Sequence, residues 1–411
     1  AKAVKAGLDL RMPGNPDTIR DVKEAVATGY MTMEEVDTAA ERVLHFLLKP
    51  IPQEESYDRD AQHEAARNVA REAICLLRND RDLLPITPKK YKKICVTGEY
   101  AVMPYINGQG SAEVFTEPEY VDTPLDCLRR MLPDTQIDYF DYLPRKKPDK
   151  MLWHYFREKM PNIESYDLVL VFTGVAPSDD SEQFDRSGNQ LAGYIEDVMR
   201  NVVFHNPNCA LILCSGCSTF KSPKADLFPA IVQMWPTGEG AGQAIADVLT
   251  GAVNPSGKLP ISFPRSVGHV PCYYNHKVTA RGIYRRPGTL EESGRDYVFS
   301  APTPLFRFGY GLSYSTYEYS DLRVKHLGGY DYQVSIKVRN TSQRAGTEVV
   351  QLYLRDDFCR MAPYVERLRG FVRVALQPGE EKTVTFLLGQ KDLSFINEAM
   401  QPEVEPGTFT V

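Results

Sequence analysis

The feature that most constrains the fold is a series of short, nearly uninterrupted apolar segments between residues 60 and 265. Five of them are rich in β-branched and aromatic residues: ICVTG, QIDYF, DLVLVFTG, ALILCSG and AIVQMW. Runs of this kind are typical of strands buried on both faces. Helical spacing appears between them, at Leu191, Ile195, Val198 and Val202 and at Ala241, Ala244, Ile245, Val248 and Leu249. This alternation predicts a parallel sheet covered by helices.

A helical pattern also precedes the first of these strands. Apolar residues fall on one face at Ala66, Val69, Ala70, Ala73, Ile74 and Leu77. The spacing predicts an amphipathic helix that continues through Leu77.

The first 50 residues contain helical patterns and no strand pattern. IRDVKEAVATG is one, and the other has apolar residues at Val36, Ala39, Ala40, Val43, Leu44 and Leu47. Two or three helices alone bury too little apolar area to be stable. We therefore expect this region to need a partner that the chain lacks.

The carboxyl-terminal region changes to a period of two. YQVSIKVRN, TEVVQLYLR, LRGFVRVAL, KTVTFLL and GTFTV alternate apolar and polar residues and are separated by polar turns such as QPGEE. The pattern predicts a small β-sandwich of about 90 residues. A connector rich in Pro and Gly, from NPSGKLPISFPRS through FRFGYGLSY, precedes it. We expect the sandwich to serve packing rather than catalysis.

Composition excludes several classes of partner. The formal net charge is -6 with no dense Lys/Arg block, which argues against nucleic acid and acidic membranes. No apolar run reaches the roughly 18 residues needed to cross a bilayer. A neutral small substrate fits this composition better. The eight cysteines are scattered, so we expect them to be reduced, which favours a cytoplasmic location.

Three short motifs resemble known sites but lack the residues that would complete them. Cys214-Ser215-Gly216-Cys217 has CxxC spacing, yet neither a helix start nor further Cys or His ligands accompany it. The segment 238–242, GEGAG, is not GxGxxG, and glycines that let a helix approach a sheet explain it equally well. Gly108-Gln109-Gly110-Ser111 has no following Lys-Ser/Thr to hold phosphates. No metal and no cofactor are expected.

The loop after DLVLVFTG is unusually acidic. It reads SDDSEQFDR over residues 178–186 and includes Asp179, Asp180, Glu182 and Asp185. In open α/β sheets, ligands bind at the carboxyl ends of strands, which is where this loop begins. A solvated acidic loop is the simpler explanation. The alternative is that one of the four carboxylates is a working acid.

Four segments resemble glycoside hydrolase family 3 of the β-glucosidase type. They are WPTGEGAGQAIADVLTGAVNPSGKLPISFPRS, VPCYYNHKVTARG, PLFRFGYGLSYSTYEYSDLRV and AREAICLLRNDRDLLPI, and they occur in the family's order. The resemblance implies an α/β plus all-β chain: the tail of a (β/α)8 barrel, an α/β/α sandwich with a mostly parallel sheet, and a fibronectin type III-like β-sandwich. AGLDLRMPG resembles the stretch near the end of that barrel.

The resemblance also implies domain limits. Residues 1–50 are expected to be the end of the barrel and 51–265 the α/β/α sandwich. Residues 266–312 are expected to form a linker and 313–411 the fibronectin type III-like domain.

The expected chemistry is retaining glycoside hydrolysis. One carboxylate attacks the anomeric carbon while another, about 5–5.5 Å away, donates a proton to the leaving oxygen. The family's nucleophile is an aspartate in a Ser-Asp-Trp motif, which does not occur in this sequence. The chain is therefore expected to supply the acid, and barrel residues upstream or on a second chain are expected to supply the nucleophile.

The family pattern around the acid is Ser-Gly-Glu-Gly, an aromatic residue and Asp-Arg. Matching backwards from Phe184 and Asp185-Arg186 places the acid/base at Glu182, with Asp179 and Asp180 as alternatives along with Asp185.

The loop departs from the family pattern at two positions, and residues near Glu182 are given a structural and a sugar-binding role. Ser181 and Gln183 stand where the family has glycines, so the loop is expected to be stiffer. Asp185 and Arg186 are interpreted as structural, because Arg can clamp a carboxylate through two hydrogen bonds. The resemblance suggests that Ser111 offers its hydroxyl to the bound sugar, although a serine in a Gly-rich turn is often only a turn residue.

The function expected from the resemblance is release of terminal non-reducing β-D-glucose from a β-linked oligosaccharide or glucoside. A β-xylosidase or arabinosidase of the same family is the alternative within enzymes. A non-catalytic carbohydrate-binding or assembly chain is the alternative from another class. A second copy of this chain, in a homodimer, is a further candidate partner.

Overall fold

The computed structural model describes residues 1–12, 14–50, 56, 58–104, 106–108, 110–141, 162–175, 182, 188, 191, 193–216, 227–277 and 303–411. The chain divides into two compact units, Ala1–Asp58 and Arg59–Val411.

The first unit contains three helices: α1 (Lys2–Lys5), α2 (Pro16–Ala27) and α3 (Met33–Leu47). The predicted helix over Val36 to Leu47 is confirmed, and Thr32 is its N-cap. The Thr32 hydroxyl accepts from the Glu35 amide and the Glu35 carboxylate accepts from the Thr32 amide, which forms a capping box. No residue of α3 is buried, so its apolar stripe stays largely uncovered within this unit.

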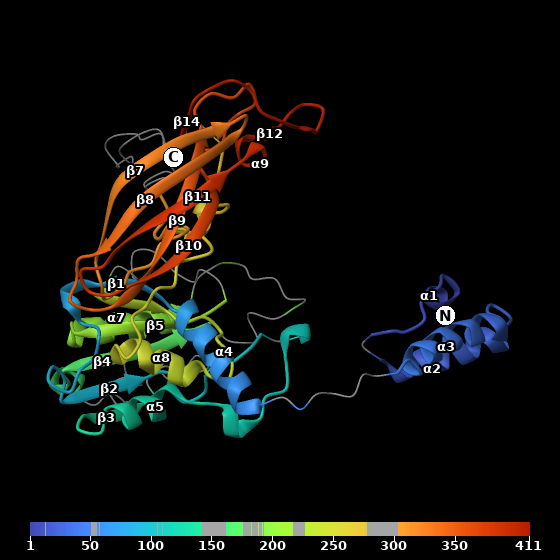
Figure 1. Ribbon diagram of the computed structural model, residues 1–411. Helices are drawn as coiled ribbons and strands as arrows, with labels where there is room; N and C mark the ends of the chain where they lie inside the picture. The colour runs from blue at the N-terminus through green and yellow to red at the C-terminus, as the bar shows by residue number, and fades with distance from the viewer. Residues whose placement is uncertain are drawn as a thin grey trace, which may run out of the picture. The chain divides into compact units, whose positions relative to one another are not determined.

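The second unit is built on a six-stranded sheet in the order β1-β6-β5-β4-β2-β3 (Figure 1). Its strands are β1 (Cys75–Asn79), β2 (Lys93–Thr97), β3 (Gln136–Phe140), β4 (Leu168–Gly174), β5 (Cys209–Cys214) and β6 (Ala230–Gln233). The five strands predicted from the apolar runs are all present, and they pair in parallel. Every residue of β4, β5 and β6 is buried, as the absence of polar alternation predicted.

The prediction of a helix through Leu77 is wrong. The helix α4 (Arg59–Ala73) ends before Ile74, and Leu77 lies in β1, which pairs antiparallel with β6. Leu76 and Leu77 are both buried and belong to the cores on opposite faces of the sheet. A strand covers both cores with consecutive side chains, which one helix face cannot do. Val69, placed on the predicted core face, is 68% exposed.

Helices cover both faces of the sheet. The core on one face includes residues of α4, α5 (Pro124–Met131) and α8 (Ala241–Thr250), whereas the core on the other face includes residues of α7 (Gly193–His205). Short 3₁₀ turns complete the unit: η1 (Asp80–Asp82), η2 (Glu99–Ala101), η3 (Gly110–Ala112), η4 (Pro118–Tyr120), η5 (Ile163–Ser165) and η8 (Val267–His269).

A β-sandwich follows, with the sheets β10-β9-β14 and β11-β8-β7. Its elements are β7 (Tyr317–Gly328), β8 (Asp331–Asn340), β9 (Gly346–Asp356), β10 (Arg367–Leu376), β11 (Glu381–Leu388), α9 (Gln390–Leu393), β12 (Phe395–Ile396), β13 (Pro402–Glu403) and β14 (Phe409–Thr410). The five predicted strands are confirmed. β7 was missed because its alternation of apolar and polar residues is interrupted where the register shifts between Ser320 and Arg323, and because no residue of this edge strand is buried.

Asn254 joins the sandwich to the α/β part of the unit. Its Nδ2 donates to Ser315 Oγ (2.7 Å) and to the Ala345 carbonyl (3.0 Å), while its Oδ1 accepts from Ser313 Oγ (2.8 Å) and the Tyr314 amide (2.9 Å). One side chain thus uses both its donor and its acceptor groups to hold the two parts together. The expected domain limits at residues 50, 265 and 312 stay predictions.

Candidate active site

Loops that follow β2, β4 and β6 meet at the carboxyl edge of the sheet. The Gly238 amide, after β6, donates to the Ile106 carbonyl, after β2 (3.2 Å). The Asp122 amide donates in turn to the Glu239 carbonyl (3.2 Å). The two loops are therefore fixed to one another by backbone hydrogen bonds at two points.

Glu182 lies in the loop after β4 and contacts the loop after β2. A Cβ built on Gly110 would lie 2.6 Å from the Glu182 Cβ and 2.8 Å from its Oε2, so only a glycine leaves room for this carboxylate. Gly110 also has a φ of +77°, which favours glycine. The Glu182 side chain is exposed in this chain. The structure thus brings the predicted acid beside the segment that contains Ser111.

The structure describes only part of the predicted site. Ser111 lies in η3, next to Gly110, but its side chain is outside the described residues. The alternatives Asp179, Asp180 and Asp185 are outside them as well, as are Ser181, Gln183, Phe184 and Arg186.

The end of β4 is fixed by close backbone packing. A Cβ on Gly174, the last residue of the strand, would lie 1.7 Å from the Cys214 carbonyl oxygen. The Tyr100 hydroxyl, from the loop after β2, donates to the Val175 carbonyl (2.5 Å). The chain therefore leaves β4 toward Glu182 from a fixed position. Neither contact could be predicted from the sequence, because Gly174 and Tyr100 belong to no recognisable motif.

Glu239 is the centre of an ion-pair network that sequence analysis missed. Its carboxylate accepts from Arg59 (2.8 Å) and from Nδ1 of His63 (3.1 Å), both on α4. Arg67 Nη2 lies 2.9 Å from His63 Nε2 and donates to Asp122 (2.8 Å). Because Arg67 has only donors, His63 Nε2 must accept, and its proton must lie on Nδ1, facing Glu239. The network fixes the loops after β2 and β6 to α4.

The hydrogen bond from Arg59 is the main reason that the pKa of Glu239 is lowered, and the bond from His63 lowers it further. Glu239 is therefore an anion near neutral pH that orients its neighbours. The sequence contained a signal for the orienting role of Glu239. In GEGAG, an acidic residue stands between two glycines shortly after a predicted strand.

Close steric contacts explain why two positions of segment 238–242 are glycines. A Cβ on Gly242 would lie 2.3 Å from the Asp122 carbonyl oxygen, at the start of α5. A Cβ on Gly240 would lie 3.1 Å from the Arg67 Cβ on α4. The sequence suggested close approach of a helix to the sheet, whereas these contacts bring α8 close to two other helices.

The CxxC motif begins at a buried thiol. Cys214 is fully buried at the end of β5, with its Sγ 3.6 Å from Met234 Sδ, and burial raises its pKa well above the ordinary value. Such a thiol is not a redox nucleophile. Cys217 lies outside the described residues. Within the part that the structure describes, no three His, Cys, Asp or Glu side chains are grouped to hold a metal ion.

Trp235, two residues after the end of β6, has a backbone φ of +64°, which is rare for a bulky residue. Its Nε1 donates to the Ala73 carbonyl (3.0 Å) and its ring meets Phe263 edge-on. Strained residues of this kind concentrate at functional sites. In the sequence, the signal for such a site was the tryptophan that ends the predicted strand AIVQMW.

Comparison with known proteins decides the family. The profile of the Glycosyl hydrolase family 3 C-terminal domain matches residues 74–314, and that of the Fibronectin type III-like domain matches residues 348–411. The chain belongs to glycoside hydrolase family 3. This confirms the resemblance and the fold class of an α/β sandwich with a mixed sheet followed by a fibronectin type III-like domain.

Relatives with assigned names are glycosidases. Thermostable beta-glucosidase B of Acetivibrio thermocellus is 33% identical over 99% of this chain and 54% of its own length. A beta-xylosidase of Formosa agariphila is 32% identical over 86% of this chain and 48% of its own. The crystal structure of a Listeria innocua beta-glucosidase in complex with isofagomine matches with a TM-score of 0.74 and 30% identity, over 99% of this chain and 57% of that one. The chain spans about half the length of the curated relatives it matches.

The composition argues against an acidic membrane as a partner. Among the helices that the structure describes, none has the length and apolar character to span a bilayer.

Proposed function

We propose that this chain is the acid-supplying portion of a retaining β-glucosidase that releases terminal non-reducing β-D-glucose. The observation that carries the proposal is the contact between Glu182 and Gly110, at the edge of the sheet where three loops meet. Family membership and the beta-glucosidase names of relatives support the same activity.

In the proposed mechanism Glu182 protonates the leaving glycosidic oxygen and later removes a proton from the attacking water. An aspartate from the barrel part, upstream or on a second chain, attacks the anomeric carbon. Glu182 is exposed in this chain, so we infer that barrel residues cover it in the complete enzyme and raise its pKa, which keeps a general acid protonated before attack. Ser111 would then hydrogen-bond the sugar from the neighbouring loop.

The test replaces Glu182 with Ala in the complete enzyme. Loss of a general acid slows catalysis about 10²–10⁴-fold. Hydrolysis of aryl glucosides with good leaving groups should slow less than hydrolysis of cellobiose, because their leaving oxygen needs little protonation. Azide should restore part of the rate. Glu119→Ala, a change at an exposed glutamate of η4, is the matched control and should leave both rates unchanged. Equal loss on both substrates would contradict the assignment of Glu182.

A β-xylosidase is the second candidate, favoured by the name of the Formosa agariphila relative. Rates on aryl β-xyloside and aryl β-glucoside separate the two. The mass of the natural polypeptide, or detection of a second chain that carries Ser-Asp-Trp, tests whether the active site is completed. Finding neither would favour a non-catalytic carbohydrate-binding chain.

A further inference from the structure

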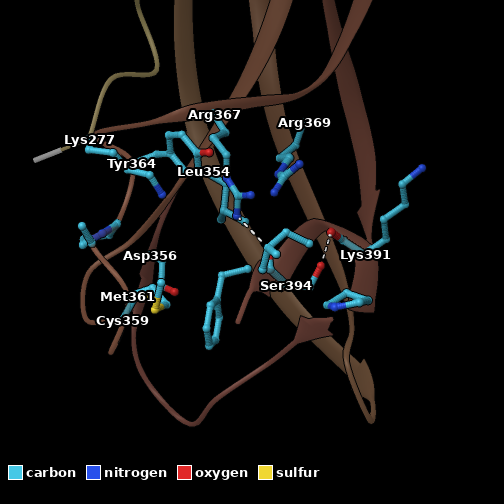
Figure 2. Close-up of a pocket in the computed structure, with 15 residues that line it drawn as sticks. Lys277, Leu354, Asp356, Cys359, Met361, Tyr364, Arg367, Arg369, Lys391 and Ser394 are labelled. Carbon is cyan, nitrogen blue, oxygen red and sulfur yellow. Dashed lines mark hydrogen bonds between the residues drawn. The ribbon is translucent and has the colours of Figure 1, made fainter. Parts of the chain in front are cut away.

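A cavity of about 520 Å³ lies at one end of the β-sandwich, between strands β9 and β10 and the segment that runs from α9 into β12 (Figure 2). Its volume is in the range of small-molecule sites. Neither the proposed hydrolysis nor the expected packing role of the sandwich uses this cavity.

Four cations line the cavity and one carboxylate opposes them. Arg367 and Arg369 come from β10 and Lys391 from α9, while Lys277 is held there by a β-bridge to Tyr364. The carboxylate is that of Asp356 at the end of β9. Burial raises the pKa of Asp356. The cavity therefore carries an excess of positive charge.

A β-bulge sets the position of Arg369. The pairing of β10 with β9 shifts between Leu368 and Gly370, so Arg369 is the extra residue of the bulged strand. Figure 2 shows the guanidinium groups of Arg367 and Arg369 side by side on β10, both extending toward the Ser394 segment, whereas Lys391 extends away from them.

The cations differ in how their donors are used. Arg367 Nη2 donates to the Ser394 carbonyl (3.0 Å), and Lys277 Nζ lies 3.6 Å from the centre of the Tyr364 ring. Arg369 Nε and Nη2 are covered from solvent and have no hydrogen-bond acceptor among the described residues. Burial and the neighbouring Arg367 charge lower the pKa of Arg369, while the Asp392 carboxylate on α9 partly offsets this shift. A buried charged donor left without a partner is unfavourable, so this arrangement favours an additional acceptor.

The unpaired atoms indicate which acceptor fits. Nε–H and Nη2–H lie on one edge of the guanidinium plane, and two parallel hydrogen bonds from such an edge match the two oxygens of a carboxylate. Arg369 also lines the cavity, and binding requires that its terminal torsions turn this edge, which is covered from solvent here, toward the cavity. Tyr364 and Phe395 give the cavity aromatic walls, which suit the face of a ring.

We propose that this cavity binds a carboxylate carried on a sugar or aromatic ring, with Arg369 holding both oxygens and Arg367 and Lys277 supplying further positive charge. The site is separate in its residues from Glu182 and does not rest on the proposed hydrolysis. Failure of the glucosidase test therefore leaves this proposal unchanged. Failure of the carboxylate-binding test likewise leaves the proposed hydrolysis unchanged.

Calorimetric titration of the 411-residue chain with sodium D-glucuronate, sodium benzoate, D-glucose and sodium sulfate tests the proposal. At least one of the two carboxylates should bind at a single site, and D-glucose, which has no carboxylate, should not. Glucuronate binding alone assigns a sugar acid, and benzoate binding alone assigns an aromatic acid. Arg369→Gln should weaken the binding tenfold or more, and Arg369→Lys nearly as much, because lysine keeps the charge but not the paired donors. Lys325→Gln, at an exposed lysine of β7 that does not line the cavity, is the matched control, with less than a twofold effect.

Thermal unfolding keeps the test decisive if a variant folds poorly. The carboxylate that binds should raise the midpoint temperature of the wild type, but not that of Arg369→Met, which removes the unpaired guanidinium and keeps an apolar side chain. Absence of binding by both carboxylates overturns the proposal. Equal binding to wild type and Arg369→Gln, or sulfate binding as tight as that of the carboxylates, also overturns it.

Discussion

Gly110 and Glu182, which come from loops after different strands, are packed so closely that a Cβ on Gly110 would lie 2.6 Å from the Glu182 Cβ. The contact makes the position of the proposed acid depend on a glycine in another loop. A methyl group at residue 110 must displace either the Glu182 carboxylate or the loop that contains Ser111. The GQGS motif thus has a steric role beside the acidic loop rather than a phosphate-binding one.

Gly110→Ala is expected to lower kcat of the complete enzyme by at least tenfold, because small displacements of a catalytic group are costly. Glucoside hydrolysis measures this. Gly379→Ala is the matched control: Gly379 has nearly the same φ, +76°, and no atom within 4 Å of an added Cβ. In both variants an alanine must adopt a positive φ, which costs about 1–2 kcal/mol. The free energy of unfolding should therefore fall by a similar amount in each. Wild-type kcat in Gly110→Ala would contradict the proposed position of the acid.

The network around Glu239 predicts a pH dependence of stability. The pKa of Glu239 is lowered from 4.5 in the folded chain, so its stabilising effect is fully present above that value and is lost as the pH falls through the lowered pKa. Glu239→Gln should cost about 1 kcal/mol at pH 7, a modest value because solvent screens Arg59. Thermal unfolding at several pH values measures it.

The difference between wild type and Glu239→Gln should shrink below pH 4.5. Glu119→Gln is the control, since Glu119 is exposed and makes no ion pair within the described residues. A difference that grows toward acidic pH would mean that the sign of the linkage is wrong.

The sequence predicted those parts of the fold whose residues are buried in a regular pattern. The strands of the parallel sheet were found because both faces are covered, as in β4. β7 was missed because it has no buried face, and the end of α4 was misplaced because Ile74 and Leu77 continue a helical spacing while lying outside the helix. In both cases pairing with another strand decides the structure, and local periodicity does not contain that information.

The candidate site was less predictable for a related reason. Motif resemblance selected Glu182, but the contact with Gly110 joins residues 72 positions apart in the sequence. The pairing of Glu239 with His63 likewise spans 176 residues. Such contacts arise only when the sheet brings the ends of its strands together, so a single sequence indicates which groups exist and not which groups meet.

Gly242 provides a test of helix packing. An added Cβ would lie 2.3 Å from the Asp122 carbonyl oxygen, and backbone atoms cannot move aside as a flexible side chain can. Gly242→Ala is expected to destabilise the chain by about 1–3 kcal/mol, the usual cost of overpacking. Gly14→Ala, with nothing within 4 Å and no positive φ, should be neutral or slightly stabilising. Urea unfolding of both variants measures this, and equal stability would mean that α8 does not depend on the glycine.

Thiol labelling tests the burial of the CxxC region. Burial raises the pKa of Cys75, Cys95 and Cys209 to about 12 each, and that of Cys214 further, so almost no thiolate forms at pH 8.5. Iodoacetamide should modify Cys359, which is partly exposed, in the native chain and should modify the five described buried thiols, which include Cys127, only after denaturation. Mass spectrometry of peptides measures both states. Rapid native labelling of Cys214 would instead indicate an accessible thiol at the end of β5 and would reopen a redox role for the motif.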